Sequence, residues 1–388
     1  MKFPKDVMLI LDTLTEAGYQ AYVVGGAIRD LLRGVHPSDY DITTNAIPSI
    51  VMDLFKIYKV FPIGLQHGTL LLRVNHHNYE ITTFREEGHY LDYRHPITVE
   101  FIGNIHSDLS RRDFTINAMA YHHELIDDHG GQKDIKAKII RAVGDPNLRF
   151  QEDALRILRA LRFSSQLHYT IEPQTKAAIL ENYPLLKNIS QERIQIEWFK
   201  MVTSDLTWIL EDYKEVIRFL FPGLTLEGIM RYREVYPHLP KELVVHLACL
   251  FLDNPRYVDD ILSMKAPKKL TEQLMSIITH YHEITSLNVE YLINIFNILK
   301  SEDVRIILLL KEVLGELPGA SVAYLDITSG PYQLSNLAMN GHDLKHLGVR
   351  PNQTMKKILL DCLVAVVKKE VKNEKDELLL WVKNTLLS

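Results

Sequence analysis

Hydrophobic and polar positions follow different periods in the two parts of this 388-residue chain. From about residue 4 to residue 125, short apolar runs alternate with amphipathic stretches, and this alternation predicts strands and helices in turn. After about residue 150, leucine and isoleucine recur at helical spacing and the strand signals end. We therefore predict an α+β chain, with a small α/β head built on a mixed sheet with helices and an all-α remainder.

The individual elements of the head can be read from the same pattern. The residues NHHN at 75–78 are typical of a turn between two strands. The predicted elements are, in chain order, a helix around 7–14, a strand at 21–24, a helix at 27–34, a strand at 39–44, a helix at 47–55, and strands at 67–74 and 79–84.

Length and composition limit the class of protein. A chain of 388 residues exceeds what one hydrophobic core usually supports, so we expect two or more packed units. The N-terminus has no apolar signal segment and no apolar run approaches about 18 residues without a charge, so we expect neither secretion nor a membrane partner. Cys249 and Cys362 lie in apolar helical contexts, which favours buried thiols over a disulfide or a metal pair and fits a reducing cytoplasm.

The net charge of −5 does not decide the partner, because nucleic-acid binding depends on where basic residues cluster. Arginines concentrate between Arg111 and Arg162, and a polyanion would meet the protein there. The charged run at 367–377 is typical of a solvated helix face, with an RNA-backbone contact as the alternative.

Two carboxylates in DYDITT, Asp39 and Asp41, are the first candidates for chemistry. The β-branched residues favour a strand, and side chains two apart on a strand share one face. Adjacent carboxylates repel each other unless a cation joins them, and Mg²⁺ prefers one or two carboxylates together with water and substrate phosphates. Two such ions could activate an attacking hydroxyl and stabilise a pyrophosphate leaving group. A solvated strand edge is the alternative for this motif by itself.

A glycine pair, Gly25 and Gly26, stands between the predicted strand at 21–24 and the helix at 27–34. This arrangement places backbone N–H groups and the positive end of a helix where a phosphate could bind, with Arg29 one turn further on. A plain strand-to-helix turn is the alternative. The chain has neither a Walker loop nor a G-x-G-x-x-G sequence, so the combination of GG and D-x-D indicates nucleoside triphosphate chemistry of another kind.

The chain resembles the bacterial class II CCA-adding enzymes, which are tRNA nucleotidyltransferases of the DNA polymerase beta superfamily. The resemblance covers nearly the whole chain and rests on motifs in the family's order: GGAIRD with DYDITTNA, ITTFREEGHYLDYRHP, RRDFTINAMAY, RAVGDPNLRFQEDALRILRALRF and SQERIQIEWFK. It implies template-independent addition of C, C and A to the tRNA 3′ end from CTP and ATP, with Mg²⁺ as cofactor. It also implies a catalytic nucleotidyltransferase head at 1–140, a neck with a base-selection helix at 141–205, a helical body at 206–315 and a tRNA-binding helical tail at 316–388.

The same resemblance implies roles for residues of the head. Asp39 and Asp41 would be the catalytic metal ligands, and Gly26 and Arg29 would contact the nucleotide. Glu80 could be a third carboxylate, but an exposed strand end explains it better.

The motif RRDFTINAMAY would supply further nucleotide contacts. By resemblance, Arg112 with Arg111 and Asp113 would hold the ribose and the phosphates. A capped helix start is the other reading of this motif and is compatible with the first. That reading expects three buried side chains, Phe114, Ile116 and Met119.

A pair in the neck could select the base. EDALRILRALRF has strong helix formers and no breaker, so Asp153 and Arg156 should lie on one helix face, where an intrahelical ion pair is the alternative to a binding role. A carboxylate beside a guanidinium fork matches the amine and ring acceptors of cytosine and adenine, and it opposes those of uracil and guanine. Arg159 and Arg162 rotate around the helix and should contact phosphate, tRNA or other side chains rather than the base edge.

The order of addition, C before A, requires a movable element. By resemblance, the loop from Glu86 to Pro96 is the candidate, with Tyr90, Asp92 and Arg94 able to exchange partners. A bacterial poly(A) polymerase or an A-only adding enzyme on the same scaffold is the alternative function, and a non-catalytic tRNA-binding protein is the rival from another class. The oligomeric state cannot be read from the sequence.

Overall fold

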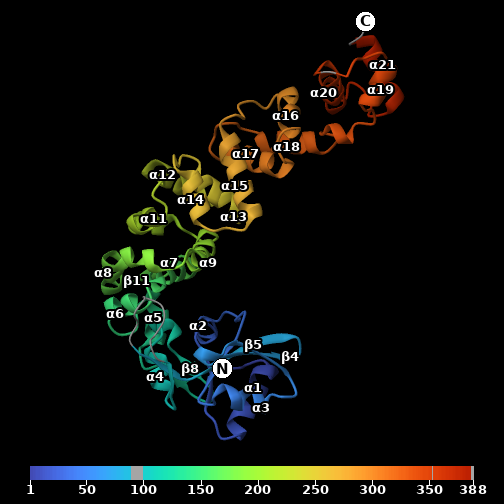
Figure 1. Cartoon of the computed structure of the whole chain (residues 1–388). Helices are drawn as coiled ribbons and strands as arrows, with labels where there is room; N and C mark the ends of the chain where they lie inside the picture. Colours follow the sequence, from blue (N-terminus) through green and yellow to red (C-terminus); the bar gives the residue numbers. More distant parts are fainter. Residues whose placement is uncertain (89–98, 352, 386–388) are drawn as a thin grey trace. The chain divides into compact units, whose positions relative to one another are not determined.

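The computed structural model describes residues 1–88, 99–351 and 353–385 (Figure 1). The chain divides into two compact units, Met1–Leu220 and Phe221–Ser388. The division falls at the start of the Pro/Gly-bearing segment 221–228. The finer boundaries at residues 140, 205 and 315 stay predictions.

A mixed sheet forms the centre of the first unit. Within the described residues it has seven strands in the order β3-β4-β5-β2-β1-β8-β9. Strands β2 and β5 are parallel, and the other neighbours are antiparallel. The strands are β1 (Ala21–Val24), β2 (Asp41–Thr44), β3 (Lys59–Gly64), β4 (Thr69–Val74), β5 (His77–Thr83), β8 (Ala120–Tyr121) and β9 (Leu125–Ile126). The predicted α+β class is confirmed.

The turn between β4 and β5 follows from its sequence. Asn75 and His76 both have positive φ, 46° and 69°. Two such residues in succession give the turn whose twist matches that of an antiparallel pair, and asparagine is among the residues that tolerate this conformation. The predicted turn at NHHN is therefore present, with β5 starting at its third residue.

Helices cover this sheet through their apolar faces. In α1, the fully buried Val7, Ile10, Leu11 and Leu14 recur at helical spacing, and the helix packs against β1 and lies beside α3 (Figure 1). The helices of this part are α1 (Lys5–Glu16), α2 (Gly26–Leu32), α3 (Pro48–Leu54), α4 (Ile105–Ser110) and α5 (Gly131–Ala137). A separate pair of short strands, β6 (Arg85–Glu87) and β7 (Val99–Phe101), flanks residues 89–98, which lie outside the described residues.

The rest of the first unit is mostly helical. Helix α7 packs against α9, and α6 packs against α8. A short parallel pair, β10 (Ile139–Ile140) with β11 (Thr170–Ile171), adds a strand where we predicted only helices. The helices are α6 (Pro146–Glu152), α7 (Leu155–Leu167), α8 (Pro173–Asn182), α9 (Gln191–Val202), α10 (Thr207–Asp212) and α11 (Lys214–Leu220).

The predicted continuous helix through EDALRILRALRF is wrong at its start. Asp153 has extended backbone angles, φ −140° and ψ 102°, and separates α6 from α7. Its side chain accepts a hydrogen bond from the backbone N–H of Leu155 (3.1 Å) and so caps the new helix. Aspartate competes with helix continuation by such local bonds, and this preference outweighs the helix propensity of its neighbours.

The second unit is helical throughout its described residues. Its helices are α12 (Leu226–Val235), α13 (Leu243–Phe251), α14 (Tyr257–Ser263), α15 (Lys268–Tyr281), α16 (Val289–Phe296), α17 (Ser301–Val313), α18 (Ala320–Thr328), α19 (Gly341–His346), α20 (Gln353–Val367) and α21 (Lys375–Thr385). Cys249 and Cys362 are free and buried here, as predicted. No helix among the described residues is long and apolar enough to span a membrane.

Candidate active site

A cavity of about 790 Å³ opens within the first unit. It lies between residues of the sheet, the segment around RRDFTINA, and helices α7 and α9. All the residues predicted as site residues line it: Gly26, Arg29, Asp39, Asp41, Arg111, Arg112, Asp153, Arg156, Arg159 and Arg162. Folding thus brings together side chains from residue 26 to residue 162. Their individual roles stay predictions.

The cavity is locally positive although the chain is acidic overall. Eight arginines and five carboxylates line it, whereas the net charge of the whole chain is −5. Arginine forms planar, paired hydrogen bonds to phosphate oxygens. The lining therefore suits a ligand with several phosphates.

The carboxylates of the site come from two neighbouring strands. Asp41 is the first residue of β2, and its Cα pairs with that of Glu80 in the parallel strand β5. Asp39 also lines the cavity but precedes the strand, so β2 begins two residues later than predicted, while the two aspartates still lie close enough for their charges to interact. Glu80 lies within β5 rather than at a strand end, and it faces the same cavity.

Restricted hydration and, to a smaller extent, mutual repulsion raise the pKa values of two of these carboxylates. Restricted hydration within the cavity, followed by the charges of Glu80 and Asp39, raises the pKa of Asp41 to about 6, against a smaller opposing effect of Arg112. Burial also raises the pKa of Glu80. The positive charge of Arg85 opposes this increase, and the negative charge of Asp39 adds to it. A cation beside the aspartates would relieve this repulsion. Since the described residues include no group of three or more His, Cys, Asp or Glu side chains arranged to hold a metal, water and substrate phosphates would have to complete the coordination.

The turn before α2 requires glycine. Gly25 has φ +70°, and a Cβ at this position would lie 3.3 Å from Nη1 of Arg112. A larger residue would therefore strain the backbone and displace the arginine. Arg29 is fixed nearby, since it donates from Nη1 to Oδ1 of Asn117 (2.9 Å) and pairs through Nε with Asp30 (3.0 Å).

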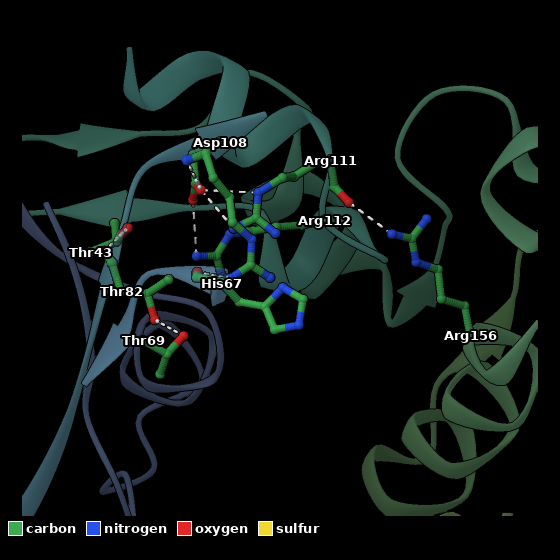
Figure 2. A network of polar contacts seen from close by, with 9 residues as sticks. Thr43, His67, Thr69, Thr82, Asp108, Arg111, Arg112 and Arg156 are labelled. Carbon is green, nitrogen blue, oxygen red and sulfur yellow. Dashed lines mark hydrogen bonds and ion pairs between the residues drawn. The ribbon is translucent and has the colours of Figure 1, made fainter. Parts of the chain in front are cut away.

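The residues proposed to select the base are held by partners that the sequence did not reveal. Oδ2 of Asp153 accepts a hydrogen bond from Nη2 of Arg193 in α9 (2.8 Å). Arg156 donates to Oε2 of Glu152 (2.6 Å) and, through Nη2, to the backbone carbonyl of Arg111 (3.1 Å), as Figure 2 shows for the second bond. Arg193 belongs to the quoted motif SQERIQIEWFK, which is the signal that could have identified it.

The two remaining arginines of α7 pair with buried carboxylates. Arg159 donates from Nε to Oδ2 of Asp113 (2.7 Å), and Nε of Arg162 lies 2.7 Å from Oε2 of Glu197. Arg162 also stacks over the ring of Phe163 (4.2 Å). These contacts order both guanidinium groups beside the cavity. That they do not contact the base edge stays a prediction.

Comparisons with known proteins identify the family. Three family models match successive parts of the chain: "Poly A polymerase head domain" over residues 21–141, "Probable RNA and SrmB- binding site of polymerase A" over residues 168–225, and tRNA nucleotidyltransferase domain 2 over residues 259–382. The CCA-adding enzyme of Lactiplantibacillus plantarum is 36% identical over 392 residues, covering 95% of this chain and 93% of that enzyme. The chain belongs to the CCA-adding enzyme family.

Other CCA-adding enzymes match more strongly over a shorter length. Those of Lactobacillus helveticus and a Geobacillus species are 52% and 50% identical over 196 and 195 residues. These two matches span about half of each relative, 49% and 48%. Nucleotidyltransferases of this family generally use a divalent metal ion.

Solved structures agree with this assignment. The crystal structure of the Bacillus stearothermophilus CCA-adding enzyme in complex with CTP is 31% identical with a TM-score of 0.79, covering 99% of this chain and 98% of that one. The Thermotoga maritima CCA-adding enzyme complexed with tRNA is 21% identical with a TM-score of 0.73, over 99% of this chain and 96% of that one, and it supports the fold alone.

Proposed function

We propose that this protein adds C, C and A to the 3′ end of tRNA, using CTP and ATP and releasing pyrophosphate, without a nucleic-acid template. The observation that carries the proposal is the 36% identity to a CCA-adding enzyme over 95% of the chain. The arginine-rich cavity with Asp39 and Asp41 at one wall supplies the chemistry that this activity needs.

The metal is proposed to be Mg²⁺, held by Asp39 and Asp41. The carboxylate oxygens of Asp39 and Asp41 are ligands that a hard divalent cation prefers, and such a cation would relieve the repulsion between the two side chains. When bound, Mg²⁺ supplies activation of the tRNA 3′ hydroxyl and neutralisation of the pyrophosphate leaving group. Glu80, beside Asp41 in the sheet, adds a further negative charge to this wall of the cavity.

The protein's own residues bind and orient the nucleotide. Arg111 and Arg112 hold the ribose and phosphates, while Gly26 and Arg29 contact the nucleotide beside the glycine turn. Because these groups are already ordered, little freedom is lost when the nucleotide binds.

Asp153 and Arg156 select cytosine and adenine. A carboxylate accepts from the exocyclic amine of either base, and a guanidinium donates to the adjacent ring acceptor. Uracil and guanine would place acceptor against acceptor and donor against donor. Each good paired contact of this type discriminates by about 1–3 kcal/mol.

The switch from C to A is assigned to the loop from Glu86 to Pro96. Most of this loop lies outside the described residues, which resume at 99. The cytoplasm is the proposed location, where the two free, buried cysteines stay reduced.

One assay tests the function. Purified protein is incubated with tRNA lacking its CCA end, with each nucleoside triphosphate alone and with CTP plus ATP, and the 3′ ends are sequenced. CTP alone should yield CC, and the mixture should yield CCA. A tail of many A residues would identify a poly(A) polymerase, A added only after CC would identify an A-only enzyme, and unchanged ends would contradict any catalytic function.

Asp39 and Asp41 are tested in the same assay. Replacing either by alanine should abolish incorporation, while the variant still folds and binds tRNA. Incorporation near the wild-type rate in either variant with Mg²⁺ present would exclude the residue as an essential metal ligand.

A further inference from the structure

A fully buried carboxylate lies behind the cavity and contacts two of its arginines. Asp108, in α4, is 0% exposed and does not line the cavity itself. Arg111 donates to its Oδ1 from both Nε (3.0 Å) and Nη2 (2.7 Å), and Arg112 donates from Nη2 to its Oδ2 (3.3 Å). Figure 2 shows both guanidinium groups converging on this one side chain.

The sequence spacing makes this convergence possible. Arg111 and Arg112 follow Asp108 by three and four positions, the separations that bring side chains together on a helical turn. The backbone N–H of Arg85, the first residue of β6, also donates to Oδ1 of Asp108 (3.3 Å). The carboxylate thus links α4 to the segment that follows β5.

Each arginine reaches from Asp108 toward a different part of the cavity. Nη1 of Arg112 lies against the glycine turn, 3.3 Å from where a Cβ of Gly25 would stand, and its Nε is buried without a hydrogen-bond partner among the described residues. Arg111 offers its backbone carbonyl to Arg156 (3.1 Å). Arg112 therefore contacts the glycine turn, where the phosphates are proposed to bind, and Arg111 contacts Arg156, which is proposed to contact the base.

We propose that Asp108 is a positioning residue for nucleotide binding, because it holds Arg111 and Arg112 in the orientation that receives the triphosphate. This inference rests on the proposed function and adds a residue that touches neither nucleotide nor metal. Its anionic form is required, since two neighbouring guanidinium groups repel each other unless a charge lies between them. An asparagine has one acceptor oxygen and no charge, so it cannot hold both.

A matched variant can distinguish a role of Asp108 in nucleotide binding from a general contribution to stability. Asp134, in α5, is also buried, pairs with an arginine, Arg141 (3.1 Å), and accepts from Thr115 (2.7 Å), but that arginine, unlike Arg111 and Arg112, does not line the cavity. Asp108→Asn and Asp134→Asn should both lower the melting temperature. Only Asp108→Asn should change how the nucleotide binds.

The experiment measures KM and kcat for CTP on tRNA lacking CCA and for ATP on tRNA ending in CC, and equilibrium binding of CTP and CMP, below the melting temperature of each variant. Partial unfolding reduces the active fraction and therefore kcat, whereas misplaced arginines raise KM. For Asp108→Asn we expect KM to rise by about tenfold or more with kcat changed less than about threefold. CTP affinity should fall more than CMP affinity, because CTP has the additional phosphates.

Two results would overturn the inference: a wild-type KM in Asp108→Asn, or equal losses of CTP and CMP affinity. If the asparagine variant does not fold, Asp108→Glu decides, since it keeps the anion but moves it; a wild-type KM there would likewise overturn the inference. Wild-type protein that leaves tRNA ends unchanged would contradict the proposed function instead, so the two failures are distinguishable.

Discussion

Replacing Asp153 separates helix capping from base selection. Its Oδ1 caps α7 at Leu155 and its Oδ2 pairs with Arg193. Loss of the cap in Asp153→Ala should cost about 1 kcal/mol, and loss of a half-buried ion pair should add at most about 1 kcal/mol. In a unit of this size each kcal/mol lowers the melting temperature by about 2–4 °C, so a loss of about 1–2 kcal/mol should lower it by about 2–8 °C in the alanine variant.

The effect on selectivity is measured separately from the effect on stability. Removing the acceptor for the exocyclic amine should lower the preference for CTP over UTP by about 1–3 kcal/mol, which is roughly 5- to 150-fold in kcat/KM. UTP should gain because its O4 no longer faces an anion. GTP should gain less because its N1–H still opposes Arg156.

The assay is kcat/KM for all four nucleoside triphosphates on tRNA lacking CCA or ending in CC. Asp145→Ala is the matched control, because Asp145 caps α6 in the same way, accepting from Asn147 (2.8 Å), but does not line the cavity. The control should lose stability and keep selectivity. If Asp153→Ala lowers every rate equally and keeps the preference for C and A, then Asp153 is only a cap and an ion-pair partner.

Three further changes test the packing and charges of the site. The pKa of Asp41 is raised from its ordinary value of 3.8 to about 6 in the folded protein, so the metal-free protein should lose stability as pH rises from about 4 to about 6. Asp41→Asn should therefore raise the melting temperature in chelator at pH 7 and not at pH 4. Gly131→Ala would place a Cβ 2.4 Å from the carbonyl of Thr115 and should cost about 1–3 kcal/mol in urea unfolding, whereas an unchanged midpoint would show that the turn yields easily. Glu197→Ala leaves the guanidinium of Arg162 buried without this partner and should cost about 3–5 kcal/mol in the same measurement; a loss below about 1 kcal/mol would show that solvent reaches the pair.

Local chemistry made the head predictable. The turn at Asn75 and His76 and the strand and helix around Gly25 follow from residues close together in sequence, and the structure has them where they were predicted. The apolar spacing of α1 likewise placed its buried face. The break at Asp153 was not predicted, because the residues around it are strong helix formers. The side chain of Asp153 nevertheless caps a new helix by accepting from the N–H of Leu155.

The residues that complete the site depend on contacts between distant parts of the chain. Glu80 faces Asp41 only because β5 pairs in parallel with β2, and a lone glutamate in a strand does not specify its neighbour. Arg193 meets Asp153 only because α9 packs against α7. The pairing of Asp108 with two arginines could have been predicted from their local spacing, but its complete burial could not be read from one sequence.

The pairing of the cavity's arginines explains how an acidic chain can offer a site to a polyanion. The charges that set the potential in the cavity are those within about a Debye length, ~8–10 Å at moderate salt, so the −5 of the whole chain has little effect there. Carboxylates hold Arg159, Arg162 and Arg193 in place before any ligand arrives. These anions reduce the local positive charge, but they also fix each guanidinium, so that binding does not have to order flexible side chains. The site therefore depends less on how many arginines it has than on the carboxylates behind them.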